Sequence, residues 1–542
     1  MARIGKFAID SLTSSMYADW QSIYREYIQN AADQIDMARE QHLEEDDYYS
    51  VHVRIFRNER KIIIEDTATG VKLEDKDLLL NIGESSKERG RRKGFRGIGR
   101  IGGIGYCNTI KFETTAKGEK YKMTIIWDAA KMNQIIDDDS DNHEAGEVID
   151  LCTDCVVEET ESIESHYFKV IIEGVTKDEL LDVEDVKNYL SMVAPVDYPT
   201  SFLRFSSKIK DYAKNHNLEL DVYNVFVGDE FGEEQIYKKY TTKIVNYKDG
   251  DYDISDIKFF SHEDQNGNIM YWGWYSISEL KGVIQSYNPA YGIRLRCKNI
   301  QLGNAETCKI FYMAEGDKRF AQYFFGELHV VGENLLPNAR RDYLKENKER
   351  TEFEHIVRKD FLVLKDLCKD ASDTRSSMNK IAKAEKGIQD IEQKRKTGSF
   401  VSEKEIQDTD KKFEEFKRNR QKEQEKLKKK MDELQQNDSP LFPVFDSMPS
   451  QKAEPSLPPT PSVPIGTTDG DTQYPTFVAD GPTDPAPDKQ QPKLRTDNVL
   501  YKKFGVKEKN VINAVYNAIY NAIADEDMRE GLIKKIEKEL TK

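Results

Sequence analysis

The feature that most constrains the fold of this chain is a glycine-rich segment near residue 100. Six glycines fall within the twelve residues from 94 to 105. Glycine lets a backbone approach a ligand closely, so successive N–H groups can surround phosphate oxygens. A flexible loop is the alternative, and the spacing lacks the GxxxxGK[ST] pattern of a P-loop. The segment predicts a phosphate-binding loop of another class, with candidate contacts at Lys87, Gly94, Gly97, Gly99 and Gly102.

A helix predicted over residues 17–40 carries three polar groups on one face. Glu26, Asn30 and Asp33 stand at i, i+4 and i+7, and apolar residues between them form another face that can pack on a sheet. A carboxylate in such a position can orient a water for attack, and an amide oxygen can hold magnesium. A solvated helix face is the alternative. The pattern makes Glu26 the candidate catalytic residue and Asn30 the candidate metal ligand.

A further carboxylate lies at the end of an apolar strand. The sequence IIIEDTATGV places Asp66 after this strand and before a turn that contains Gly70. A carboxylate at a strand end can accept a hydrogen bond from the exocyclic amine of adenine. The alternative is an ordinary turn, since Asp commonly starts turns. Asp66 and Gly70 are therefore candidates for a base-reading position.

The order and spacing of these three elements resemble the GHKL superfamily. Its ATP site combines a helix with Glu and Asn, a DxGxG strand end and a glycine-rich lid. EYIQNAAD is similar to the ExxxNxxD helix, which implies Glu26 as general base, Asn30 as magnesium ligand and Asp33 as a nucleotide-site residue. Ala68 stands where the DxGxG pattern has glycine. The resemblance implies an ATPase, an ATP phosphohydrolase that uses ATP and Mg²⁺.

Two segments resemble the ninety-kilodalton heat-shock chaperone family more closely. NIGESSK is similar to the start of its lid, which implies Asn81 and Lys87 as nucleotide contacts, and GFRGIGR resembles its GQFGVGF. GFRG also occurs in MutL-type mismatch-repair ATPases. FFGELHVVGENLLPNARRDYL looks like the end of the chaperone middle domain, which implies that Arg341 reaches the γ-phosphate as a second catalytic residue. Without this resemblance, Arg341 is an ordinary surface charge.

The pattern along the chain predicts a mixed α/β multidomain protein. Short alternating strands over residues 1–199 predict an α/β sandwich, which the resemblance makes a GHKL (Bergerat) ATP-binding domain. Residues 200–348 predict a second α/β unit of the middle or transducer type, with YNVFVG among its strands. Residues 349–437 are helical and charged, and we expect a coiled-coil hairpin that turns at Gly398.

The last hundred residues differ in composition. Thirteen of the 17 prolines lie between residues 440 and 492, so residues 438–497 predict a disordered linker. Residues 498–542 predict two short amphipathic helices. So small a unit ordinarily needs a partner surface, and we expect an oligomerisation or docking module.

Composition limits the remaining choices. The net charge of −16 disfavours wholesale coating of nucleic acid, although residues 411–430 hold ten basic and four acidic residues. No stretch is apolar enough for a membrane span, and no signal sequence opens the chain, so we expect a cytoplasmic protein. Cys152 and Cys155 could begin a zinc site, but no second pair follows at ligand spacing, so reduced thiols are expected.

Three functions remain open for such an ATPase. The first is a chaperone-like, ATP-dependent conformational switch that closes its lid, dimerises and remodels a protein partner. The second is a MORC-like nucleic-acid clamp, whose domain order of ATPase, second domain and helical hairpin this chain shares. The third is a regulatory or antiviral-defence component that recruits an effector through residues 498–542. We expect the chain to form a homodimer, and the dependence of the dimer on nucleotide is left open.

Overall fold

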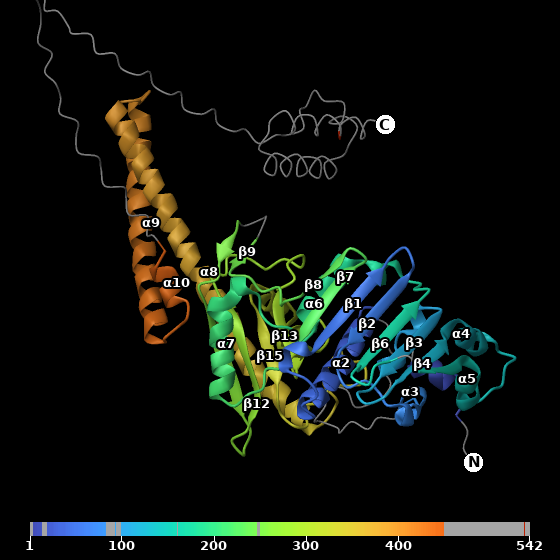
Figure 1. The fold of residues 1–542 in the computed structure, drawn as a ribbon. Helices are drawn as coiled ribbons and strands as arrows, with labels where there is room; N and C mark the ends of the chain where they lie inside the picture. The colour runs from blue at the N-terminus through green and yellow to red at the C-terminus, as the bar shows by residue number, and fades with distance from the viewer. Residues whose placement is uncertain are drawn as a thin grey trace, which may run out of the picture. The chain divides into compact units, whose positions relative to one another are not determined.

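The strands of the computed structural model form two main sheets, with helices packed against both (Figure 1). The structure describes residues 4–12, 19–82, 93, 99–159, 161–245, 250–448 and 536. The chain divides into two units, Met1–Pro455 and Ser456–Lys542. None of the helices in these described ranges has an apolar stretch long enough to cross a bilayer.

The helices are α1 (Phe7–Leu12), α2 (Ser22–Glu40), α3 (Asp77–Leu80), α4 (Ala129–Asp137), α5 (Ala145–Cys152), α6 (Val183–Val193), α7 (Leu203–Asn215), α8 (Lys348–Thr397), α9 (Glu403–Gln436) and α10 (Phe442–Asp446). The strands are β1 (Ser50–Phe56), β2 (Lys61–Asp66), β3 (Thr109–Thr115), β4 (Tyr121–Asp128), β5 (Thr153–Glu159), β6 (Tyr167–Glu173), β7 (Asn224–Asp229), β8 (Gly232–Gln235), β9 (Lys243–Ile244), β10 (Tyr252–Asp253), β11 (Asp256–Glu263), β12 (Ile269–Ile277), β13 (Gly292–Cys297), β14 (Ile300–Gln301) and β15 (Phe325–Val330).

The first sheet has eight strands in the order β5-β4-β3-β6-β2-β1-β7-β8. All neighbours are antiparallel except β1 and β7, which run parallel. Burial alternates along β1, β2 and β3, so one face of the sheet is the core face. Residues of α2, α4 and α6 complete this core. The expected α/β sandwich with one face covered by helices is therefore present.

The strand YNVFVG lies in a different place from the one its sequence position suggested. We expected it in the second α/β unit, but β7 pairs with β1 in the first sheet, from Ser50 opposite Asn224 to Arg54 opposite Gly228. The preceding helix α7 packs instead against Trp272 and Trp274 of the second sheet. The chain therefore crosses between the two sheets, and this crossing ties them together.

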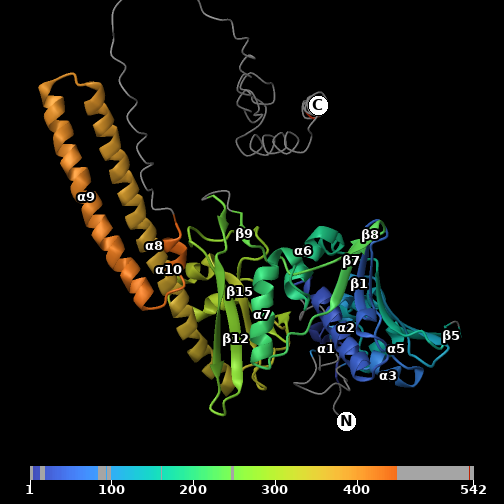
Figure 2. The same cartoon turned by 60° about the vertical axis from the view of Figure 1, so that its left-hand side comes forward.

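The second sheet has five strands in the order β11-β12-β15-β13-β14. Strands β12 and β15 are buried along almost their whole length, because helices cover both faces. Trp272 and Trp274 face α7, while Tyr271 and Tyr275 face the first turns of α8. Figure 2 shows α7 and α8 on opposite sides of β12 and β15.

A buried charge cluster lies within this second sheet. The carboxylate of Glu327, on β15, is 2.9 Å from Lys238 Nζ and 2.6 Å from Arg296 Nε, and it accepts a hydrogen bond from Tyr198. Burial opposes ionisation, yet Arg296 and Lys238 hold the pKa of Glu327 well below its ordinary value. Lys238 also donates to Asn299 Oδ1 at 2.9 Å. The cluster thereby fixes the turn between β13 and β14.

Helices α8 and α9 form the expected helical hairpin. The turn uses Gly398 at φ 64°, a left-handed conformation that suits glycine. Two ion pairs join the helices. Near the turn, Lys394 Nζ lies 2.5 Å from Glu405 Oε1, and at the other end of the hairpin Lys430 Nζ lies 2.6 Å from Asp370 Oδ1. Phe413 is buried against Ile388 and Ile391, and Leu434 of α9 joins the larger core that includes Ala371 of α8.

The start of the expected linker is ordered. Residues 442–446 form α10, and Leu441, Val444 and Phe445 pack into the core shared by the second sheet and α8. Apolar side chains thus outweigh the nearby prolines. The remainder of the linker and the C-terminal module lie outside the described residues, apart from Ile536.

Candidate functional site

Helix α2, which packs on β1 and β2 of the first sheet, carries the predicted polar face. Glu26 is 7% exposed, Asp33 is fully buried and Asn30 is half-buried. The opposite face, which includes Ile28 and Ile35, is buried in the sheet core. Apolar packing therefore fixes the helix, and this orientation directs two carboxylates and an amide into the protein.

The end of β2 forms a tight turn around Asp66. The residue is 4% exposed, and its Oδ1 accepts a hydrogen bond from the backbone N–H of Ala68 at 3.1 Å. Ala68 is fully buried. Gly70 has φ +63°, and a Cβ there would lie 1.8 Å from the carbonyl oxygen of Thr115. The turn thus accepts Ala68 as a buried residue. At position 70 it requires glycine, because of the positive φ and the nearby carbonyl oxygen of Thr115.

The glycine-rich segment is only partly described. Lys87, Gly94 and Gly97 lie outside the described residues. Gly99 lies against the predicted base, because a Cβ at Gly99 would be 2.4 Å from Glu26 Oε2. Gly102 is buried, and its N–H donates to the carbonyl of Gly99 at 3.2 Å. Two of the four predicted glycines are thus placed beside α2.

Asn81 lies at the opposite end of this segment. Asn81 follows α3 and is exposed. Its carbonyl oxygen accepts a hydrogen bond from Arg100 Nη2 at 2.5 Å. The hydrogen bond joins the residue that follows α3 to the glycine-rich segment.

The predicted second-domain arginine reaches the first domain. Arg341 Nε lies 3.1 Å from Glu26 Oε1, and Arg341 Nη2 donates to the carbonyl of Lys93 at 2.9 Å. Arg341 is 9% exposed and has φ 56°, in the left-handed region. Its carbonyl accepts from the N–H of Gly303 at 2.9 Å. A surface charge would not be held in this way, so the structure joins Arg341 to the site.

A second contact joins the residues that precede Glu26 and Arg341 in the sequence. Arg25 is 5% exposed and donates from Nη2 to the carbonyl of Arg340 at 3.1 Å. Its Nε lies 3.9 Å from Glu26 Oε1. Glu26 is therefore bordered by a cation from its own helix and by a cation from the loop after β15.

Sequence reasoning missed a third cation. Lys298 lies at the turn between β13 and β14, with φ 49°. Burial lowers the pKa of Lys298; nearby Lys93 lowers it further, and the charges of Asp221 and Asp33 oppose this effect. The charge of Asp33 acts on Lys298 although the two residues are 265 positions apart in the sequence. No local pattern around Lys298 signals this position.

Lys93 was missed as well, although it lies inside the glycine-rich segment. Its N–H donates to Asp33 Oδ1 at 2.6 Å, and its ammonium is 2.7 Å from Asp36 Oδ2 and 2.8 Å from Asp221 Oδ2. It also donates to Tyr223 Oη at 2.5 Å. These contacts join the segment to α2 and to the strand connection before β7.

The arrangement suits a magnesium nucleotide. Magnesium at nucleotide sites usually takes one or two protein ligands and completes its shell with phosphate oxygens and water. The amide oxygen of Asn30, on the same helix face as Glu26 and Asp33, could serve as such a ligand. Among the described residues, no group of three or more His, Cys, Asp or Glu side chains is placed to hold a metal ion by itself. Cys152 and Cys155 therefore belong to no such group.

Comparison with known families identifies the first domain. Residues 24–154 match the family of histidine kinase-, DNA gyrase B- and HSP90-like ATPases. The match begins just before Glu26 on α2 and ends in β5. No curated protein matches the chain. The chain therefore contains a GHKL-type ATPase domain, and this confirms the resemblance at the level of the superfamily.

We predict that Gly70→Ala damages the nucleotide site. A methyl group there must displace the Thr115 carbonyl, so we expect nucleotide affinity to fall by about tenfold or more and the unfolding temperature to drop. Titration with a fluorescent ATP analogue and thermal unfolding measure the two effects. Gly118→Ala is the matched control, because Gly118 also has positive φ but has no neighbouring atom within 4 Å of the new Cβ. Equal nucleotide affinity in the two variants would contradict the prediction.

Proposed function

We propose that this protein is an ATP-driven conformational switch that binds Mg-ATP and hydrolyses it slowly. The observation that carries the proposal is the contact of Arg341, from the loop after β15, with Glu26 of the GHKL-type domain at 3.1 Å. A cation that comes from a second domain can sense the terminal phosphate and stabilise charge during transfer. Such a site couples turnover to the position of the second domain.

In this mechanism Glu26 orients the attacking water as a general base. The Arg341 guanidinium lies 3.1 Å from Glu26 Oε1, so it occupies the place beside this carboxylate that an attacking water would need. The pair of Glu26 and Arg341 is therefore a resting arrangement. A bound γ-phosphate competes for Arg341 and frees Glu26 for the reaction. Turnover then depends on the movement of Arg341 from carboxylate to phosphate.

The remaining site residues have complementary roles in this proposal. Asp66 reads the adenine amine, and Gly70 allows the turn that holds it. Asn30 holds Mg²⁺, which supplies positive charge to the phosphates when it is bound. The glycine-rich segment surrounds the phosphate oxygens with N–H groups.

The second domain has a direct route to the rest of the chain. Helix α8 packs its first turns on the second sheet, through Phe353, Val357 and Phe361, and then continues into the hairpin without a break. At 50 residues it is about 75 Å long. A rotation of the second sheet therefore moves the hairpin tip through a larger distance. This lever supports a machine that remodels a protein partner in a chaperone-like way.

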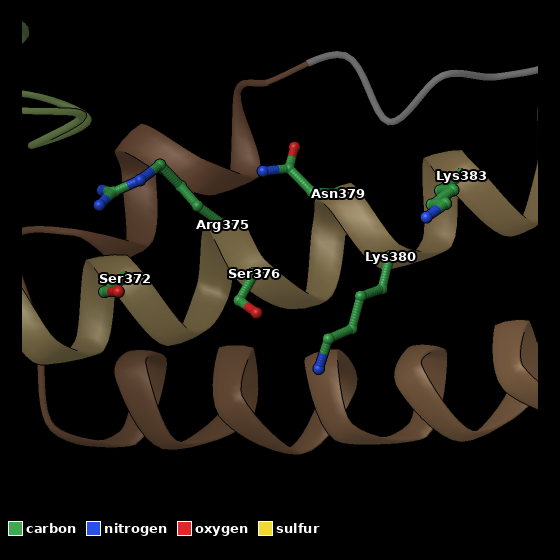
Figure 3. A pocket seen from close by; sticks show the side chains of 6 residues that line it. All are labelled: Ser372, Arg375, Ser376, Asn379, Lys380 and Lys383. Atoms are coloured by element: carbon green, nitrogen blue, oxygen red, sulfur yellow. The ribbon is translucent and has the colours of Figure 1, made fainter. Parts of the chain in front are cut away.

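The helical hairpin also favours a second candidate, the nucleic-acid clamp. A groove of about 420 Å³ lies along α8, and Figure 3 shows its six lining side chains, Ser372, Arg375, Ser376, Asn379, Lys380 and Lys383. All of them are basic or uncharged. Lys380 pairs with Glu423 at 3.3 Å, and Arg375 donates to the backbone carbonyl of Glu279. Hydroxyl, amide and cationic groups together suit phosphate oxygens. Recruitment of an effector through residues 498–542 stays a prediction.

Two substitutions test the switch. We expect Glu26→Ala to lower kcat by about a hundredfold or more while ATP binding survives, because a general base acts only in the reaction. Arg341→Ala is expected to lower kcat with little change in nucleotide affinity, since Arg341 contacts Glu26 and the phosphate from outside the binding domain. Steady-state ATPase assays and titration with a non-hydrolysable analogue measure both. Normal turnover in Glu26→Ala would remove Glu26 from the mechanism.

Dimerisation is a separate part of the proposal. We expect the mass in solution to double when a non-hydrolysable ATP analogue is added, as for a clamp that closes on nucleotide. Light scattering on the full chain and on a chain ending at Asn437 measures this effect. A dimer in both nucleotide states of the full chain, and in neither state of the shorter one, would assign dimerisation to the C-terminal residues instead.

The groove on α8 has its own test. We expect Lys383→Glu to weaken retention of duplex DNA and to reduce its salt dependence, because a phosphate contact is lost. Lys369→Glu is the matched control: it makes the same charge change on α8, at a lysine that pairs with Asp366 at 3.2 Å outside the groove. Fluorescence anisotropy with and without ATP measures the affinity. Equal binding by both variants would rule out the groove.

A further inference from the structure

The side chain of Lys93 has no hydrogen-bonding capacity left for a phosphate group. Its ammonium has three hydrogens, and it has three oxygen partners within hydrogen-bond distance: Asp36 at 2.7 Å, Asp221 at 2.8 Å and Tyr223 at 2.5 Å. The Tyr223 hydroxyl in turn donates to Asp36 Oδ1 at 2.6 Å. Only 3% of the lysine side chain is exposed. The charge of Lys93 is therefore used within the protein.

The carboxylates around Lys93 come from two different parts of the chain. Asp36 belongs to α2, and Asp221 precedes β7 in the connection that returns from α7. The backbone carbonyl of Asp221 accepts a hydrogen bond from Asn299 Nδ2 at 2.6 Å. Asn299 is in turn fixed by Lys238. The ammonium of Lys93 thus forms ion pairs with α2 and with the connection before β7, and this connection is hydrogen-bonded to Asn299 in the turn after β13.

The backbone of Lys93 makes the contacts that bear on the reaction. Its N–H donates to Asp33 at 2.6 Å, and its carbonyl oxygen accepts from Arg341 Nη2 at 2.9 Å. The same guanidinium places Nε 3.1 Å from Glu26. The planar guanidinium has fixed directions for its N–H groups, so the position of one acceptor determines where the others lie. The Lys93 carbonyl therefore sets the angle at which Arg341 meets Glu26.

We infer that Lys93 is a positioning residue for the proposed ATPase reaction, whose buried side chain anchors the backbone carbonyl that aligns Arg341 with Glu26. The inference rests on the proposed function, because it assigns Lys93 a role that acts through Arg341. It also gives a basic residue of the glycine-rich segment a role other than phosphate binding. Asp36, Asp221 and Tyr223 form the socket that makes this anchoring specific.

The test is a double-mutant cycle of Lys93→Met and Arg341→Ala. We expect Lys93→Met to lower kcat by about tenfold or more and to leave KM and analogue binding within about threefold, because it removes alignment but no phosphate contact. In the Arg341→Ala background, Lys93→Met should cause no further loss, since both substitutions disable one unit. Lys430→Met is the control, because Lys430 also pairs with two acidic residues but lies in the hairpin.

The outcomes separate the possible failures. Normal kcat in Lys93→Met, a rise in KM alone, or additive losses in the double variant would each overturn the role of Lys93. An unchanged kcat in Arg341→Ala would instead overturn the proposed role of Arg341. If Lys93→Met lowers the unfolding temperature far below that of Lys430→Met, Asp221→Asn replaces it in the cycle. Asp221→Asn keeps an oxygen acceptor but removes one charge, so it should lower kcat by a smaller factor than Lys93→Met does.

Discussion

The contact of Arg341 with Glu26 is the interaction on which the arrangement of this protein depends. Both side chains are at least nine-tenths buried, and a buried charge is costly unless it is paired and hydrogen-bonded. Arg341 meets this requirement through Glu26 and through the Lys93 carbonyl. Glu26 lies on a helix that packs on the first sheet, and Arg341 follows the strand β15 of the second sheet, so the pairing holds only when the two sheets are correctly placed. The chemistry of the site is thus tied to the relation between the domains.

The second sheet is built to hold its side of that contact. Glu327 sits at the centre of the sheet and pairs with Lys238 and Arg296, so the β13–β14 turn and the connection before β7 are fixed by the same cluster. Arg296 also donates to the carbonyl of Met192 at the end of α6, on the first-domain side. Buried networks of this kind favour one arrangement over others because each partner left unpaired is costly. The second domain therefore presents its cations from a defined surface.

Much of the candidate site could be predicted from the sequence, because its parts are local. The face of α2 follows from helical spacing, and Asp66 and Gly70 follow from a strand that ends in a turn. The strand at residues 223–228 was placed in the wrong sheet, because alternation of apolar residues predicts a strand but not its partner. The first part of the linker was also wrong: three apolar residues there pack on the core despite the prolines around them.

The sequence by itself determined the class of site: a helix with Glu26 and Asn30, a strand ending in Asp66 and a glycine-rich segment allow few alternatives at their spacing. It also pointed to Arg341, but only through a resemblance. The tertiary structure alone decided that Lys93 joins the site, and that Lys93 directs its charge towards Asp36 and Asp221. The physical reason is that ion pairs and hydrogen bonds depend on distance in space, and the hydrogen-bonded residues Arg341 and Lys93 are 248 positions apart in the chain.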